Sequence, residues 1–208
     1  MKILLISDVE DPLLWDYFSP GKLDGYDLIL SAGDLDSAYL SFLVTMGHAP
    51  VFYVHGNHDG RYTLFPPEGC ECIEDRVVTF QGVRILGLGG SVLYNGGSFQ
   101  YTERQMRRRV FRAGFPIRRA KGVDLIVTHA PPKGVGDDAD YAHRGFEACL
   151  PLLRRWRPKA LIHGHVHVLF GVNRVNRCGE TLVINATRRC DLYLGEAGAT
   201  SPVAVYLP

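Results

Sequence analysis

The sequence predicts an α/β fold with a largely parallel β-sheet that is buried on both faces. Several apolar runs of four to seven residues lack the alternation typical of a half-exposed strand. Helix-like segments separate the first of these runs, and each run ends in polar residues. The predicted buried strands are residues 2–7, 26–32, 51–54, 124–128 and 159–163.

The remaining elements complete a single predicted domain over residues 1–208. Helical patterns occupy residues 13–18, 37–46, 101–114 and 145–156. Two β-hairpins and one closing strand are expected at residues 76–80 with 83–88, 168–175 with 180–185, and 203–207. We find no repeat, low-complexity segment or linker, and 208 residues is an ordinary length for one domain.

The composition is that of an ordinary soluble protein, with 46% hydrophobic and 22% charged residues. The formal net charge of +1 gives no overall field that would attract nucleic acid or an anionic membrane. The sequence shows no signal-peptide pattern and no apolar run of about 20 residues. The five cysteines are dispersed and odd in number. We therefore expect a cytoplasmic protein with reduced thiols and no membrane partner.

Metal-ligating side chains follow five of the predicted strands at the point where each strand ends. In α/β sheets, ligands bind beyond the carboxyl ends of the strands. Carboxylates, an amide and imidazoles form a mixed oxygen and nitrogen set, which suits Mn, Fe, Zn or Mg better than a metal that prefers thiolates. Seven donors are too many for one ion and about right for two. They are Asp8, Glu10, Asp34, Asn57, His129, His165 and His167.

Each of these residues also has a purely structural interpretation. An aspartate at a strand end is commonly a turn residue or a helix cap, and a lone histidine commonly has an ordinary surface or core role. Such separate structural roles do not explain the whole set. Residues 56–59 (Gly-Asn-His-Asp) and 164–167 (Gly-His-Val-His) both follow buried strands, and chance placement of both motifs is improbable. Within a shared site, Asp34 is the natural bridge because a carboxylate has two oxygens. Two ions ~3.5–4 Å apart can hold a phosphate and lower the pKa of a water between them.

This series of motifs resembles the calcineurin-like metallophosphoesterase family, in a bacterial, single-domain form. The motifs occur in the family's order and span about three-quarters of the chain. They are Asp8-x-Glu10, Gly33-Asp34, Gly56-Asn57-His58-Asp59, His129 and Gly164-His165-Val166-His167. The resemblance implies a four-layer α-β-β-α sandwich, in which two mixed β-sheets are flanked by helices.

The resemblance also implies roles for individual residues. One ion would be held by Asp8, residue 10, Asp34 and His167, and the other by Asp34, Asn57, His129 and His165. His58 would contact the phosphate or donate a proton to the leaving group, and Asp59 is a candidate to orient His58. We expect Mn in both positions, with Fe, Zn, Mg or Ni as alternatives.

Glu10 departs from the family pattern, which usually has histidine at this position. Ionised Glu10 would leave the site with a net charge of about +1 where histidine would leave about +2, so a bridging water would be less acidified. Such a site should favour a harder ion such as Mn or Mg. Alternatively, Glu10 points away and the first metal position is weak.

Two further segments are candidates for substrate contact. His143 and Arg144 follow a loop rich in aspartate and glycine, and they resemble a His-x-Gly segment of the family. Their alternative interpretation is an ordinary helix N-terminal turn. A run of arginines between Arg104 and Arg119 could be a solvated helix face, or could bind remote phosphates, nucleic acid or another subunit. We see no aromatic residues interleaved for stacking on single strands.

The sequence thus predicts a hydrolase in which a hydroxide between two metal ions attacks a phosphodiester or phosphomonoester. Asn57 would stabilise the phosphoryl oxygens, and His58 would assist the leaving oxygen. The expected partner is a small phosphorylated substrate, and a homo-oligomer is possible in principle. Two rival functions remain open. One is a nuclease that uses the arginine face, and the other is a protein-binding module that has lost catalysis, like the retromer scaffold subunit.

Overall fold

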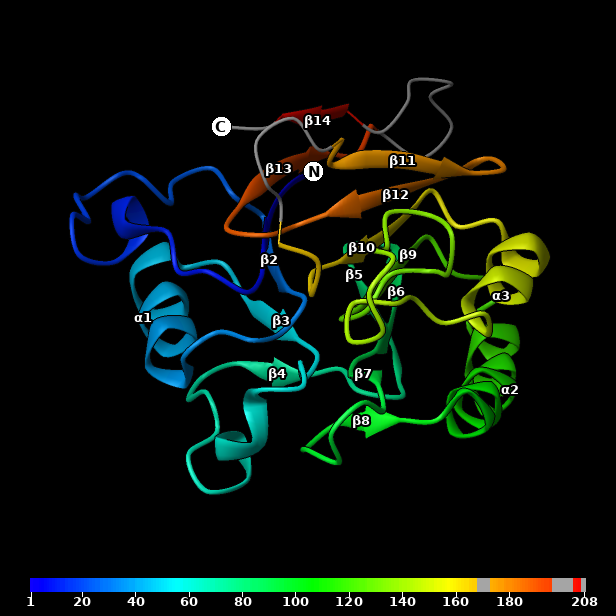
Figure 1. Ribbon diagram of the computed structural model, residues 1–208. Coiled ribbons are helices and arrows are strands. Elements are labelled where there is room, and N and C mark those ends of the chain that lie inside the picture. The colour runs from blue at the N-terminus through cyan, green and yellow to red at the C-terminus, as the bar shows by residue number, and fades with distance from the viewer. Residues whose placement is uncertain (168–172, 196–203, 207–208) are drawn as a thin grey trace.

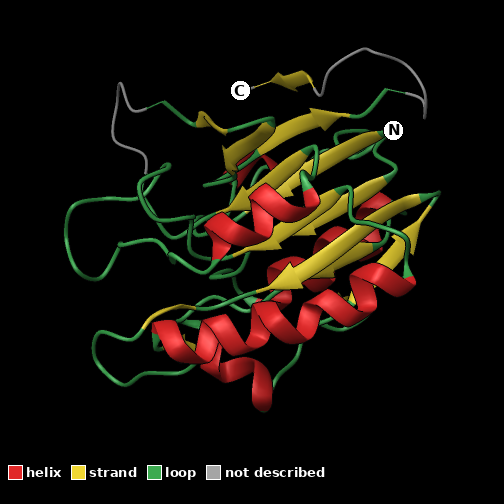
Figure 2. Ribbon diagram, turned by 90° about the vertical axis from the view of Figure 1, so that its right-hand side faces the viewer, coloured by secondary structure: helices red, strands yellow, loops and turns green. Residues whose placement is uncertain are grey.

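Two six-stranded mixed β-sheets lie face to face at the centre of the molecule, with helices on both outer sides (Figure 1). The computed structural model describes residues 1–167, 173–195 and 204–206. Figure 2 is turned so that α2 (Glu103–Arg119) and α3 (Cys149–Trp156) face the viewer, and it shows helices covering this face of the strands. The four layers confirm the predicted α-β-β-α sandwich.

The first sheet is a parallel run of strands extended at one edge by two antiparallel strands. Across this sheet the order is β14 (Ala204–Tyr206), β13 (Cys190–Tyr193), β1 (Lys2–Ile6), β2 (Leu28–Ser31), β3 (Val51–Tyr53) and β4 (Glu71–Cys72). Neighbours from β1 to β4 pair in parallel, with Leu4 opposite Ile29 and Leu30 opposite Phe52. The pairs β1–β13 and β13–β14 are antiparallel.

The second sheet has four parallel strands with one antiparallel strand at each edge. Its order is β11 (Val175–Cys178), β12 (Thr181–Asn185), β10 (Ala160–His163), β9 (Leu125–Thr128), β6 (Val83–Leu88) and β5 (Val77–Phe80). The edge strands β11 and β5 run antiparallel to their neighbours. A small parallel pair, β7 (Ser91–Val92) and β8 (Gln100–Tyr101), follows β6 in the chain.

The apolar runs are continuous because each sheet is covered on both faces. Along β1, Ile3 and Leu5 pack between the two sheets, whereas Leu4 packs toward the side of α1 (Ser37–Gly47). Along β10, Ile162 likewise faces the other sheet, while Leu161 joins the cluster that includes residues of α2 and α3. Successive side chains of a strand point to opposite faces, so a strand covered on both sides needs apolar residues at every position.

Helices α1 and α2 begin at side-chain caps that the sequence supplies. Asp36 caps α1 by accepting a hydrogen bond from the Ala38 amide. At the start of α2, Thr102 and Gln105 form a reciprocal capping box. Helix α2 continues beyond its predicted end and includes Pro116, which removes one helical hydrogen-bond donor but does not end the helix.

Several predicted elements differ from the structure. The segment 13–18 is not an α-helix, and only a 3₁₀ turn, η1 (Pro12–Leu14), forms there. Helix α3 begins four residues later than predicted, at Cys149. The strand predicted at 168–175 shares only Val175 with β11 (Val175–Cys178), and residues 168–172 lie outside the described part of the chain. Strands β4, β7, β8 and β13 were not predicted. No helix within the described residues combines the length and apolar character needed to cross a bilayer.

Candidate metal centre

The predicted donors lie beyond the carboxyl ends of strands from both sheets. Asp8, Asp34 and Asn57 follow β1, β2 and β3 of the first sheet. His129 and His165 follow β9 and β10 of the second sheet. The two groups meet because the parallel strands of both sheets end on the same side of the sandwich, as the contacts below establish.

Three of the donors form a compact cluster around the buried His129 side chain. One ligand atom each from Asp34, His129 and His165 can be chosen so that all lie within 4.8 Å of one another. His129 Nε2 lies 3.2 Å from Asp34 Oδ2 and 3.0 Å from the Asn57 Oδ1 atom. His129 Nδ1 lies 2.8 Å from the Ala32 carbonyl oxygen, a geometry that favours a proton on Nδ1. When the His129 ring is neutral, lone pairs on His129 Nε2, Asp34 Oδ2 and Asn57 Oδ1 therefore point toward one another, as metal ligation requires.

His165 is fixed by a similar pattern of contacts. The backbone amide of His165 donates a hydrogen bond to Asp8 Oδ1 at 2.8 Å, which joins the ends of β10 and β1. The His165 Nε2 atom lies 2.7 Å from the Ala142 carbonyl oxygen, so Nδ1 keeps its lone pair when Nε2 carries the proton. Asp8 Oδ2 accepts a further hydrogen bond from the Thr187 hydroxyl. Burial lowers the pKa of His165 to about 3, which keeps this ring neutral.

Three of the donors have a backbone conformation that residues other than glycine rarely adopt. The φ angles of Asp8, Asp34 and His165 are 62°, 58° and 67°. Such left-handed conformations are enriched at functional sites, where surrounding contacts hold them in place. Each of these residues comes shortly after the end of a buried strand, where the chain turns sharply and presents the side chain to the cluster.

Two motif glycines are required because the ends of the strands approach one another closely. A Cβ atom on Gly56 would overlap the Asp34 carboxylate, and one on Gly164 would overlap the Asp8 carboxylate. A side chain at either position would therefore push a predicted ligand out of place. This is the physical reason for glycine in the Gly-Asn-His-Asp and Gly-His-x-His motifs.

The electrostatics of the cluster suit a cation. Burial alone would lower the pKa of His129, but the negative charges of Asp34 and Asp8 raise it to about 9. Burial would raise the pKa of Asp34, but the interaction with His129 outweighs it and holds this pKa below its usual range. The carboxylates thus attract positive charge into a buried site, and a divalent ion can supply it in place of the His129 proton.

The two remaining predicted ligands lie at the margin of the cluster. Glu10 Oε1 accepts a hydrogen bond from the Asp36 amide at 2.9 Å, at the start of α1. Glu10 also lines a cavity of about 500 Å³ together with Asp34 and His58. His167 is exposed, and the centre of its ring lies 5.9 Å from that of His143. The ligand roles of Glu10 and His167 stay predictions.

Comparison with known proteins identifies the family. A family model described as calcineurin-like phosphoesterase matches residues 1–169. The chain belongs to this family. An uncharacterized protein of Haemophilus influenzae is 25% identical over an alignment of 155 residues, and the match covers 59% of this chain and 64% of that protein. The human metallophosphoesterase domain-containing protein 1 is 29% identical over 124 residues, which are 57% of this chain and 35% of the relative. The matches thus span less than two thirds of either relative.

Two solved structures share the fold. The protein TT1561 of Thermus thermophilus has a TM-score of 0.57 at 16% identity, with 89% of this chain and 88% of that chain covered. GAP50, the anchor in the inner membrane complex of Plasmodium, has a TM-score of 0.53 at 14% identity, over 90% of this chain and 71% of that one. The cluster around His129 has the mixed oxygen and nitrogen ligand chemistry that metal-dependent hydrolysis of a phosphoester needs.

His58 and Asp59, two residues of the family's Gly-Asn-His-Asp motif, make different contacts. The His58 side chain is exposed, and its backbone amide donates to Asp34 Oδ1 at 2.7 Å. Asp59 is buried, and its Oδ2 atom accepts from the Asp34 and Gly56 amides at 2.9 and 2.7 Å. Asp59 was expected to orient the His58 ring, but its hydrogen bonds instead fix the backbone that carries Asp34.

Two residues outside the sequence motifs, Tyr94 and Thr187, form hydrogen bonds with predicted metal ligands. The Asn57 Nδ2 atom donates to the Tyr94 hydroxyl at 3.1 Å, and Tyr94 lies in the loop between β7 and β8. Thr187, the partner of Asp8, follows β12. Neither belongs to a recognisable motif. Their positions depend on loop conformation, which periodicity does not report.

The predicted substrate contacts are only partly close to the cluster. The ring of His143 lies with its centre 5.1 Å from that of His165, and His143 Nδ1 is 2.7 Å from Asp140 Oδ2. Arg144 is exposed, with its guanidinium carbon 5.3 Å from the centre of the Tyr141 ring. His143 therefore lies beside His165, a predicted metal ligand, whereas the Arg144 side chain lies near the ring of Tyr141.

Proposed function

We propose that this protein is a binuclear metal-dependent phosphoesterase that hydrolyses a phosphodiester or phosphomonoester. The observation that carries the proposal is the convergence of Asp34 Oδ2, Asn57 Oδ1 and His129 Nε2, with the His165 ring beside them. These donors come from both sheets and are held by partners outside the cluster. This rigidity is what a catalytic metal site requires.

The ligand sets remain those implied by the sequence motifs. Asp34 would contribute to both ions, with Asp8, Glu10 and His167 on one side and Asn57, His129 and His165 on the other. Two such ions would supply a water of lowered pKa as the nucleophile and positive charge for the phosphoryl oxygens. The oxygen-rich first position supports Mn as the physiological ion in this proposal.

The chain's own residues would carry the remaining steps. His58 is exposed beside the cavity that Asp34 also lines, so its imidazole can reach the leaving oxygen of a bound ester and donate a proton to it. Asp59 would hold the Asp34 backbone in its left-handed conformation during the reaction. The cysteines of the protein are all free thiols, which supports a reducing compartment such as the cytoplasm.

Metal analysis combined with an activity screen tests the proposal. Purified protein should bind up to two equivalents of Mn and hydrolyse members of a panel of phosphomonoesters and phosphodiesters. Asp34→Asn should lose metal and activity together, because the bridging carboxylate is removed. Glu71→Gln, at an exposed carboxylate of β4, is the matched control and should resemble the parent. The proposal would be contradicted if the parent protein bound no metal and hydrolysed no ester when Mn is added. That result would favour a protein-binding role.

A further inference from the structure

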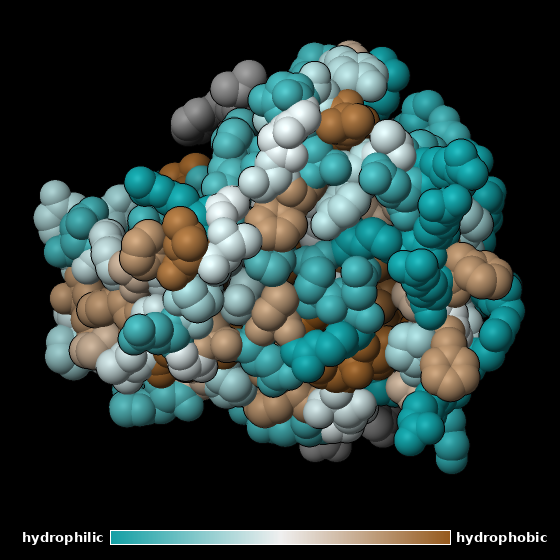
Figure 3. All heavy atoms as spheres, turned by 90° about the horizontal axis from the view of Figure 1, so that it is seen from below, coloured by the Kyte–Doolittle hydropathy of each residue, from teal (hydrophilic) through white to brown (hydrophobic). Residues whose placement is uncertain are grey.

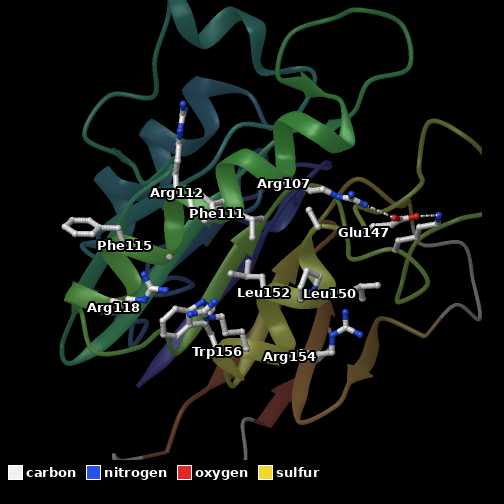
Figure 4. Close-up of a pocket in the computed structure, with 16 residues that line it drawn as sticks. Arg107, Phe111, Arg112, Phe115, Arg118, Glu147, Leu150, Leu152, Arg154 and Trp156 are labelled. Atoms are coloured by element: carbon white, nitrogen blue, oxygen red, sulfur yellow. Dashed lines mark hydrogen bonds and ion pairs between the residues drawn. The ribbon is translucent and has the colours of Figure 1, made fainter.

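A cavity lies away from the predicted metal ligands, between α2 and α3. It has a volume of about 1080 Å³ and forms an open groove on the outer side of the second sheet (Figure 4). Viewed from below, the side of the molecule where α2 lies is largely hydrophilic, with separate apolar side chains at the surface (Figure 3). We call this feature the α2–α3 groove.

The charges that line the groove are almost all positive. Arg107 and Lys133 are both paired with Glu147, at 3.1 and 2.6 Å. The other charged lining residues make no ion pair within the described part of the chain. They are Arg112, Arg118, Arg154 and Arg155. The groove therefore carries a concentrated positive charge although the whole chain has a net charge of only +1.

Aromatic side chains stand exposed among these arginines. Phe111 is 86% exposed and Phe115 is 71% exposed, so neither contributes to the core. Trp156 lines the same groove from α3, and the Arg155 guanidinium carbon lies 5.4 Å from the centre of its ring. The expectation that no aromatic residues are interleaved with the arginines is therefore wrong, because Phe111 and Phe115 lie within the arginine run of α2 itself. The packing of α3 against α2 adds Trp156 to them.

The groove also leads toward the metal ligands. Lys133 and Glu147 line both the groove and a smaller cavity of about 280 Å³, which Tyr141 and Arg144 also line. Arg144 directly follows His143, whose ring lies beside that of His165. Basic and aromatic side chains therefore occur at intervals between the groove and the candidate metal centre.

We propose that the α2–α3 groove binds single-stranded nucleic acid, with phosphates on its arginines and bases stacked on its aromatic rings. Guanidinium groups bind phosphates in a bidentate manner, and exposed rings accept bases without regard to sequence. The strand's phosphodiesters would then be the substrate class of the metal centre. This last step rests on the proposed function, whereas binding in the groove does not.

Other occupants fit the groove less well. A second copy docking through the same face would bring arginines against arginines, because an isologous interface pairs identical patches. An acidic protein segment would neutralise the arginines but would leave the exposed faces of Phe111 and Phe115 without a specific role. Cleavage of a bound strand is chemically complete with water alone. The oxygen of water joins phosphorus, one phosphorus–oxygen ester bond breaks, and the departing oxygen gains a proton.

Binding can be measured by fluorescence anisotropy with the full, metal-loaded chain. The probe is a labelled phosphorothioate oligouridylate of about 20 nucleotides, long enough for a typical single-strand site and resistant to hydrolysis. With four arginine contacts, the slope of log K against log salt should be about −3, so affinity should fall roughly fifty-fold between about 50 and 200 mM salt. A duplex of equal length should bind more weakly, because its bases cannot reach the rings.

Variants separate the contributions of charge and stacking. Arg118→Ala and Arg155→Ala should each reduce the slope by about 0.7. Phe115→Ala should weaken binding roughly five- to a hundred-fold and leave the slope unchanged. Arg177→Ala removes an exposed arginine of β11 outside the groove and is the matched control, with binding equal to the parent. Circular dichroism confirms that each variant is folded.

The outcomes distinguish this inference from the proposed function. A slope near zero, or groove variants that bind like the parent, would overturn the groove assignment. Polyglutamate that binds as tightly as the oligonucleotide, with the same loss in Phe115→Ala, would assign the groove to acidic protein segments instead. Hydrolysis of bis(p-nitrophenyl) phosphate by parent protein that fails to bind the strand would preserve the proposed function and remove the inference. Salt-dependent binding of the strand by protein that does not hydrolyse bis(p-nitrophenyl) phosphate would preserve the inference and contradict the proposed function.

Discussion

The Tyr94 hydroxyl accepts a hydrogen bond from the Asn57 Nδ2 atom at 3.1 Å, and Asn57 Oδ1 faces His129 Nε2 on the other side of the same amide. An amide group can rotate to exchange its oxygen and nitrogen, so a partner for the nitrogen decides which atom faces the cluster. The Gln100 side chain fixes the Tyr94 loop by accepting from the Tyr94 and Asn95 amides. Tyr94 is therefore positioned to keep a ligand oxygen directed at the metal centre.

Tyr94→Phe should weaken metal binding at the position that Asn57 serves. The variant keeps the ring and removes only the hydroxyl, so the amide of Asn57 loses its fixed orientation. Loss of such an outer partner typically reduces metal affinity about 10- to 100-fold. Metal titration by calorimetry measures the change. The control is Tyr17→Phe at a 71% exposed ring, and equal affinity in both variants would remove the positioning role of Tyr94.

His58→Ala should lower the turnover number about 10²- to 10⁴-fold while metal content stays the same. The reason is that the exposed imidazole can act on the leaving oxygen, whereas only the backbone amide of His58 touches Asp34. His48→Asn is a suitable control, since His48 is exposed at the end of α1 with a φ of 55°, which asparagine tolerates. A His58 variant that loses its metal instead would show that the ring is a ligand.

Glu10 variants separate ligation from support of α1. Glu10→His should shift activity from Mn or Mg toward Zn or Fe, because imidazole suits those ions better than carboxylate does. Glu10→Ala should lose the first metal and most activity. Glu10→Gln keeps an oxygen for the Asp36 amide but loses the charge, so it should retain the thermal stability of the parent while binding the first metal weakly. If the Gln and Ala variants keep full metal content and activity, Glu10 serves only the start of α1.

Asp124→Asn should remove part of the stability that the protein has at neutral pH. Arg84 donates to both oxygens of Asp124, at 2.7 and 2.8 Å, and joins β6 to the start of β9. Burial would raise the pKa of Asp124, but Arg84 outweighs this effect and lowers it. A lowered pKa stabilises the fold above the unfolded-state value of about 3.9 and loses this contribution as the pH falls through the folded-state value.

Urea unfolding at several pH values measures the Asp124 contribution. At pH 7 the variant should be less stable by about 1.5–3 kcal/mol, the usual size of a hydrogen bond to a charged group. As the pH falls through the lowered folded-state pKa, the parent carboxyl becomes protonated, and the two proteins should converge in stability. A difference in stability that does not shrink as the solution is acidified below the unfolded-state pKa of about 3.9 would mean that the charge of Asp124 contributes nothing.

The sequence predicted the parallel centre of both sheets because those strands are covered on both faces and carry apolar residues throughout. It did not predict β13, whose residues Cys190–Tyr193 alternate in burial and include Asp191. That strand is defined by its antiparallel pairing with β1, a contact between the two ends of the chain. The prediction of a helix at residues 13–18 was wrong for a different reason. Aromatic residues of this segment pack onto α1 without a regular helix, as Trp15 does against Tyr39.

For the metal centre too, some features could be predicted from the sequence and others could not. Donors placed at strand ends could be predicted, because parallel strands bring their carboxyl ends to one edge. The burial of His129 and the contacts of Asp34 and Asn57 with it agree with that reasoning. Contacts made by backbone atoms, such as the Asp59 hydrogen bonds to the Asp34 and Gly56 amides, could not be predicted, because any residue type supplies the donor.

The joining of two sheets at one cluster has a consequence for folding kinetics. Asp8 and Asp34 follow strands of the first sheet, while His129 and His165 follow strands of the second. The contact between Asp8 and His165 joins residues 157 positions apart in the chain, so the complete ligand set exists only after both sheets have docked. Interactions absent from the folding transition state slow unfolding and leave the folding rate nearly unchanged. A bound ion would therefore act chiefly as a kinetic stabiliser that prolongs the lifetime of the native state.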